Sequence, residues 1–82
     1  MTDKLTELHN RLTREFITKA VKEIQAAGGD YTDLLVLHES LTMGVMMTLQ
    51  KLYGMRPSTA ATLVDEMVHR AMERFAKDNN DA

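Results

Sequence analysis

The feature that most constrains this fold is the apolar segment 33–53, DLLVLHESLTMGVMMTLQKLY. A helix advances about 100° per residue, so residues three and four apart share a face. On that geometry one broad face of the segment carries Leu34, Leu35, His38, Leu41, Thr42, Val45, Met46, Leu49, Leu52 and Tyr53. This spacing predicts a long helix with a buried stripe.

The opposite side of the same segment is also apolar and small. It carries Val36, Leu37, Ser40, Met43, Gly44 and Met47. The residues predicted to form the contact are Val36, Ser40, Met43, Gly44 and Met47. Ser40 and Gly44 lie four residues apart, and their lack of bulk lets another backbone approach closely. A helix that is apolar nearly all round lies in a large core, in a membrane or at an interface. Since a chain of 82 residues encloses little, we expect an interface with a second copy.

A membrane span is the rival explanation for this segment. Spanning a bilayer takes roughly 20 largely apolar residues with few charges, but Asp33, Glu39 and Lys51 interrupt the run. The first residues lead into a charged amphipathic pattern rather than the apolar core of a secretory signal. Absence of cysteine rules out disulfides and thiolate metal sites. We therefore expect a cytoplasmic protein that does not insert into membranes.

Helical periodicity extends over most of the chain. It predicts helices over 3–27, 31–53 and 58–77, with a frayed polar tail at 78–82. The first helix has an apolar stripe that is expected to be buried: Leu5, Leu8, Leu12, Phe16, Ile17, Ala20, Val21, Ile24 and Ala27. Short connections bring successive helices back antiparallel. The predicted fold is one all-α domain, 1–82, an up-down three-helix bundle with a strongly apolar central helix, completed by dimerisation.

The predicted helices begin and end at residue types that commonly cap helices. Gly28 and Gly29 end the first helix, and either Asp30 or Thr32 is placed to cap the second. Gly54 sits where a left-handed cap is favoured, and Pro57 cannot continue the second helix.

Charge is balanced along the chain, with a net charge of −2. Acidic and basic residues alternate on the outer face of the first helix, where Glu7 and Arg11, and Glu15 and Lys19, are predicted to pair four residues apart. Such a face is typical of a solvated surface. A balanced charge argues against nucleic acid as a partner, because binding to duplex depends on neutralising phosphates.

Two histidines are candidates for a buried polar or ligand site. His9 lies near the apolar line of the first helix, and His38 lies in the middle of the main face of the second. A buried imidazole can act as base, ligand or pH switch. The pattern favours two core histidines bonded to backbone or threonine oxygen, because a third ligand is lacking. Glu66 and His69 have di-iron spacing in a single copy that faces away from the apolar stripe. We expect no metal, no cofactor and no enzyme activity.

The segment 54–70 has the outline of a helix-turn-helix motif. In that motif the start of the second helix enters the major groove of DNA, and the residues so placed are Arg56, Ser58, Thr59 and Thr62. Asp65 and Glu66 follow on the same helix and would repel phosphate. A plain turn between antiparallel helices explains the same residues and is favoured.

Methionine is frequent, with seven in the chain. Flexible thioether side chains fill irregular gaps and suit surfaces that accept varied apolar partners. The sequence therefore favours a small non-catalytic protein-protein interaction or regulatory protein, a homodimer or higher oligomer that also binds a protein partner. The alternative is a DNA-binding regulator that uses segment 54–70.

Overall fold

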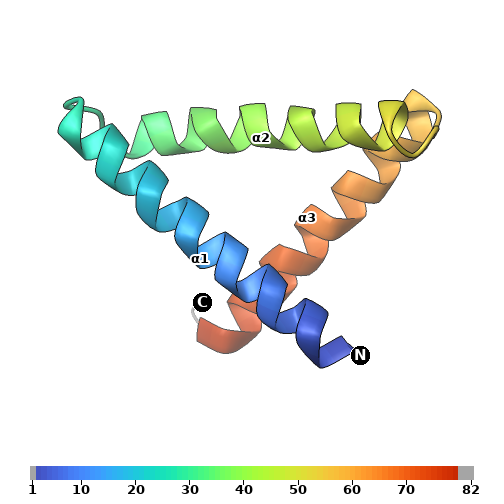
Figure 1. Ribbon diagram of the computed structural model, residues 1–82, viewed down its shortest axis with the longest axis horizontal. Coiled ribbons are helices and arrows are strands. Elements are labelled where there is room, and N and C mark those ends of the chain that lie inside the picture. Colours follow the sequence, from blue (N-terminus) through green and yellow to red (C-terminus); the bar gives the residue numbers. More distant parts are fainter. Residues whose placement is uncertain (1, 80–82) are drawn as a thin grey trace. The chain divides into compact units, whose positions relative to one another are not determined.

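The computed structural model describes residues 2–79 and contains three α-helices there, with no strands among these residues (Figure 1). They are α1, Thr2–Ala26, α2, Tyr31–Lys51, and α3, Pro57–Asn79. The all-α prediction with three helices is confirmed. In the predicted tail, residues 78 and 79 are still helical, and 80–82 lie outside the described residues.

Two compact units divide the chain, and the boundary falls inside α2, between His38 and Glu39. The first unit is a helical hairpin around the α1–α2 turn. Its half-buried residues, the glycine of the turn aside, are Ala20, Val21, Ile24, Leu34 and Leu37. Within the described residues of this unit, the apolar contact is formed by the last turns of α1 and the first turns of α2.

The second unit is a hairpin around the α2–α3 turn. Ala60, 1% exposed, is the buried hydrophobic side chain of the described residues. The half-buried residues around it come from both helices and the turn: Thr42, Met46, Leu49, Met55, Leu63, Val64 and Val68. The core of this unit is therefore small and lies next to the turn.

Glycine ends α1 in a Schellman motif. Gly28 has a φ of 83°, in the left-handed region that residues with a Cβ disfavour. Its N–H donates to the carbonyl of Gln25 at 3.0 Å, and the N–H of Gly29 donates to the carbonyl of Ile24 at 2.8 Å. Two carbonyls at the helix end are thereby satisfied, and the prediction for this turn is confirmed.

Two aspartates cap α2 reciprocally. The Asp30 carboxylate accepts the N–H of Thr32 at 2.9 Å and also the Thr32 hydroxyl. In return, the N–H of Asp30 donates to the Asp33 carboxylate at 2.9 Å. The helix start thus satisfies its own backbone donors, as in a capping box. These hydrogen bonds to the ionised form, the Thr32 hydroxyl first, lower the pKa of Asp30 from its ordinary value of 3.8.

This cap gives a pH-dependent prediction. Because the folded pKa lies below the unfolded value, the ionised cap stabilises α2 above about pH 4, and that stability is lost as pH falls through the folded pKa. Asp30→Asn keeps a capping side chain but removes the charge. We expect the variant to melt below the parent at pH 7 and the gap to narrow at pH 2, measured by circular dichroism. A gap that is equal at both pH values would contradict the charged cap.

The second turn places the start of α3. Gly54 has a φ of 70°, and the N–H of Met55 donates across the turn to the carbonyl of Leu49 at 3.1 Å. Pro57 takes the first helical position, where its missing N–H costs nothing. The first backbone bond of α3 then runs from the N–H of Ala60 to the carbonyl of Arg56 at 3.0 Å.

Among residues 2–79, none of the three helices combines the length and apolar character that a membrane span requires.

Candidate functional site

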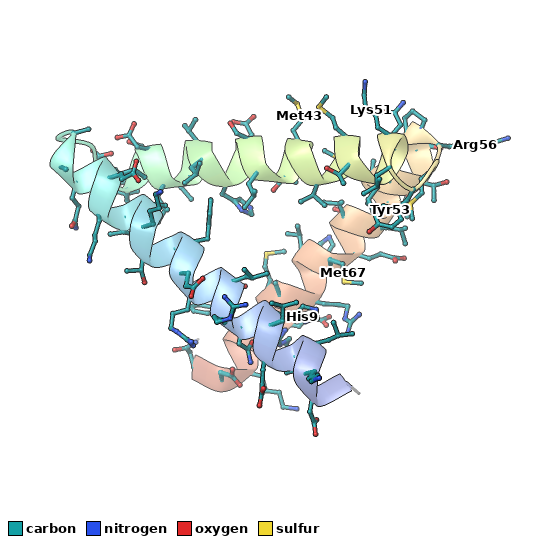
Figure 2. The ribbon with its side chains drawn as sticks, viewed as in Figure 1. His9, Met43, Lys51, Tyr53, Arg56 and Met67 are labelled. Atoms are coloured by element: carbon teal, nitrogen blue, oxygen red, sulfur yellow. The ribbon has the colours of Figure 1, made fainter. Side chains whose placement is uncertain are left out.

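The α2 face is the set of five residues predicted to form an interface: Val36, Ser40, Met43, Gly44 and Met47. All five are exposed. Among its apolar side chains, Val36 is 58% exposed, Met43 is 57% exposed and Met47 is 47% exposed. Figure 2 shows Met43 projecting away from the helix axis. α2 therefore presents an exposed apolar strip.

The centre of the α2 face leaves the backbone accessible. A Cβ built on Gly44 would meet nothing within 4 Å. One turn later, the Thr48 hydroxyl donates to the Gly44 carbonyl at 2.8 Å, so that carbonyl keeps a partner in addition to the helix ladder. A second helix can thus approach Gly44 closely while the Gly44 carbonyl keeps its hydrogen bonds.

The histidines are placed differently from the expectation. His9 and His38 are both exposed, so the interior position expected for each is not what the structure shows. Among the described residues, no three His, Asp or Glu side chains gather as a metal site would require. The Nε2 atom of His69 lies 3.6 Å from the Asp65 carboxylate, both side chains being exposed. A ligand role for His9 and His38 stays a prediction.

The four residues of the DNA-binding alternative lie at the start of α3 and are all exposed. Arg56 extends from the α2–α3 turn into open space (Figure 2). The Thr62 hydroxyl donates to the carbonyl of Ser58 at 2.9 Å, so this hydroxyl is already engaged within the helix. Duplex contact by Arg56, Ser58, Thr59 and Thr62 stays a prediction. It requires an affinity that falls steeply with salt and on Arg56→Glu.

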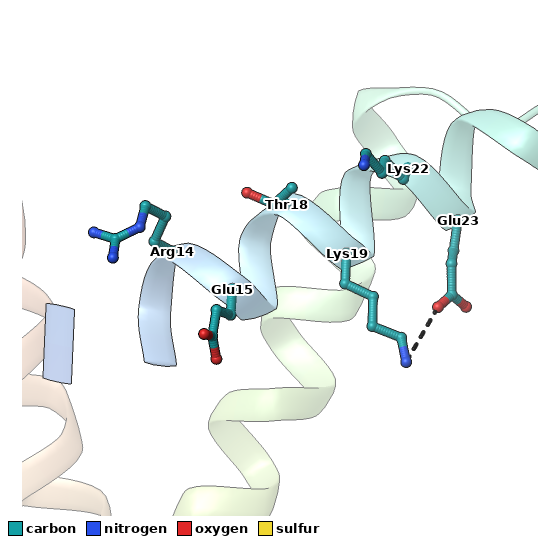
Figure 3. Close-up of a pocket in the computed structure, with 6 residues that line it drawn as sticks. All are labelled: Arg14, Glu15, Thr18, Lys19, Lys22 and Glu23. Atoms are coloured by element: carbon teal, nitrogen blue, oxygen red, sulfur yellow. Dashed lines mark ion pairs between the residues drawn. The ribbon is translucent and has the colours of Figure 1, made fainter. Parts of the chain in front are cut away.

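A shallow hollow of about 590 Å³ lies on α1 (Figure 3). It is lined by Arg14, Glu15, Thr18, Lys19, Lys22 and Glu23. Lys19 pairs with Glu23 at 3.6 Å, and Arg11 pairs with Glu15 at 3.3 Å. The partners predicted from acid-first spacing, Glu7 for Arg11 and Glu15 for Lys19, are wrong because each base pairs toward the C-terminus. Both pairs are well exposed, so this is a solvated face and no reactive group converges on the hollow.

A second exposed apolar surface, which the sequence did not lead us to expect, lies on α1. The amino-terminal half of α1 was expected to be buried, yet its large side chains are 51%, 37%, 51% and 41% exposed for Leu5, Leu8, Leu12 and Phe16. We call these four residues the α1 stripe. The signal lay in the spacing: steps of four residues advance about 40° each around the helix, so the apolar line drifts away from the residues that pack near the turn.

The chain matches no protein-family model, no curated protein and no solved structure. Evidence for a function therefore comes from the chain itself, chiefly from the exposed α2 face and the exposed α1 stripe.

Proposed function

We propose that this chain is a small non-catalytic protein-protein interaction or regulatory protein of the cytoplasm that acts as a homodimer through the α2 face. The observation that supports it best is the combination at Gly44 of open space with flanking exposed methionines. Water-exposed apolar area of this kind is favourable to bury, at about 25 cal/mol per Å². Dimerisation would complete the bundle that the short apolar contacts of the two units leave unfinished.

A second copy is a better occupant of this face than an unrelated helix because the face is self-complementary. Twofold symmetry brings the same patch of both copies together. Two helices that cross at Gly44 would place each Ser40 and Gly44 opposite small residues, so that the backbones approach closely. Val36, Met43 and Met47 would then fill the space on either side of the crossing.

The methionines suit the second part of the proposal, binding of a further protein. Met43 and Met47 lie one helical turn apart, and thioether side chains change rotamer at low cost. A dimer that pairs its α2 helices brings these side chains from both copies together. The resulting apolar surface would accept an amphipathic helix of a partner.

Native mass spectrometry across a dilution series tests the dimer. We expect the parent chain at twice its 9.3 kDa mass, without any adduct, because the uncovered α2 face is too apolar to stay in water. Dilution below the dissociation constant of the dimer should release monomer. A chain that stays monomeric at every concentration would contradict the proposal, and added mass would indicate a ligand instead.

A further inference from the structure

Methionine is the residue type through which an oxidant acts on this chain. The sequence contains neither cysteine nor tryptophan, but seven methionines. Peroxides convert an accessible thioether into a sulfoxide, which is polar where the thioether was apolar. The effect of an oxidant on this protein therefore depends on where the methionine sulfur atoms lie.

Two methionines belong to the α2 face. Met43 is 57% exposed and Met47 is 47% exposed. Because they are four residues apart, they lie one turn apart on the same side of α2. Oxidation of both would place two polar groups in the middle of an apolar strip.

These two side chains are separate from the core of their own unit. In that unit, the half-buried residues of α2 are Thr42, Met46 and Leu49. At about 100° per residue, the mean direction of Met43 and Met47 lies roughly 110° away from the mean direction of those three residues. Oxygen added to Met43 and Met47 therefore leaves the packing of the α2–α3 hairpin intact.

The α2 face offers few hydrogen-bond donors to a sulfoxide. A sulfoxide oxygen is an acceptor, and burying an acceptor without a partner is costly. Among the five residues of the face, Ser40 supplies one hydroxyl against two methionine sulfur atoms. The Thr48 hydroxyl already donates to the Gly44 carbonyl at 2.8 Å. Two oxidised copies packed on this face would consequently bury sulfoxide oxygens that lack donors.

We propose that Met43 and Met47 form an oxidation switch, in which their conversion to sulfoxides separates the dimer into monomers. The inference rests on the proposed function, because it takes the α2 face as the contact between two copies. In the chemical step, a peroxide transfers one oxygen atom to the thioether sulfur. The O–O bond breaks, an S–O bond forms, the sulfur loses two electrons, and the peroxide leaves as water or an alcohol.

The switch is reversible, since methionine sulfoxide is a substrate for thiol-dependent reductases. Two thiols supply the two electrons, and the products are the thioether, a disulfide and water. Assembly and oxidation are then linked in both directions. The dimer covers both sulfur atoms and slows their oxidation, while each sulfoxide disfavours the dimer. Because the monomer is the form that reacts, the rate of oxidation follows the monomer fraction.

A pulse of hydrogen peroxide on the full chain, at concentrations on both sides of the dimer dissociation constant, tests this linkage. Fragmentation mass spectrometry measures the sulfoxide at each methionine. We expect Met43 and Met47 to oxidise about tenfold faster at about one hundredth of the dissociation constant than at about one hundred times that constant. Met46, which faces the core of its own unit, should oxidise at the same rate at both concentrations. Sedimentation equilibrium of the oxidised chain should show a dissociation constant about 100-fold higher than that of the parent.

Leucine at both positions provides the matched control. Met43→Leu with Met47→Leu keeps the apolar volume without the sulfur. This variant should dimerise with the parent affinity both before and after peroxide treatment. Met43→Gln with Met47→Gln brings a polar oxygen to the same place and should separate the dimer without any oxidant. Leucine and glutamine are good helix formers, and circular dichroism checks that α2 stays helical.

Three results would overturn the proposal. The first is a rate of oxidation at Met43 and Met47 that is independent of protein concentration. The second is a chain oxidised at both positions that dimerises as tightly as the parent. The third is loss of the leucine variant's dimer on peroxide treatment, which would place the sensitive group elsewhere.

Failure of the switch is separable from failure of the proposed function. If Gly44→Phe separates the dimer and oxidation does not, the α2 face stands and the switch alone fails. If the untreated chain is monomeric at every concentration, the proposed function fails and the switch fails with it.

Discussion

Gly44→Phe is expected to raise the dissociation constant of the dimer at least 100-fold, about 3 kcal/mol. A phenyl ring at the point of closest approach would force the two α2 backbones apart. In the isolated chain the same ring meets only solvent, since nothing lies within 4 Å of a Cβ at Gly44. Phenylalanine also has a better helix propensity than glycine, so α2 itself should not unfold.

The matched control is Gly44→Ala. One methyl group adds little bulk, and the helix gains about 1 kcal/mol from the change. We expect this variant to remain a dimer and to resist urea better than the parent. Sedimentation equilibrium on the three proteins measures the contrast. A Gly44→Phe dimer as tight as the parent would remove the α2 face as the interface.

Gly29→Ala is expected to destabilise the chain by about 2 kcal/mol and to lower its melting temperature by about 10 °C. The backbone of Gly29 is in an ordinary conformation, so the reason is space rather than φ. A Cβ there would lie 2.6 Å from the Asp33 carboxylate and 2.8 Å from the Ile24 side chain. To relieve this clash, either Asp33 or Ile24 has to move. Asp33 accepts a hydrogen bond from the N–H of Asp30, and the branched side chain of Ile24 is stiff.

Urea unfolding followed by circular dichroism measures this effect, and Gly44→Ala serves as its control. The two substitutions are chemically identical but should change the free energy of unfolding in opposite directions. Equal stabilisation by both would mean that the α1–α2 turn relaxes freely around a methyl group. The cap of α2 would then tolerate displacement of Asp33.

Local sequence was enough to predict the helices because their ends are set by nearby residues. Gly28 ends α1 through a left-handed turn, and Asp30 begins α2 by bonding to Thr32. Pro57 extends α3 one residue before its predicted start at 58, because proline fits the first helical position. Each of these interactions spans only a few residues, so no knowledge of the tertiary fold was needed.

Burial was harder to predict, because it depends on which parts of the helices overlap. The periodicity of α1 indicated one continuous buried stripe, but only the part near the turn meets α2, and Leu5, Leu8 and Leu12 are left exposed. His9 was expected inside for the same reason. On α2, Leu35, Leu41 and Val45 were expected to be buried but are 59%, 47% and 45% exposed. The role of the α2 face as an interface stays a prediction.

The boundary between the two units falls within α2, and this bears on how the chain unfolds. A cut between His38 and Glu39 would leave each hairpin with a fragment of α2 near or below the roughly 12–15 residues at which a helix becomes marginal in water. Neither hairpin would then hold its own part of α2 as a stable helix. We therefore expect heat or denaturant to unfold the whole chain in one cooperative transition.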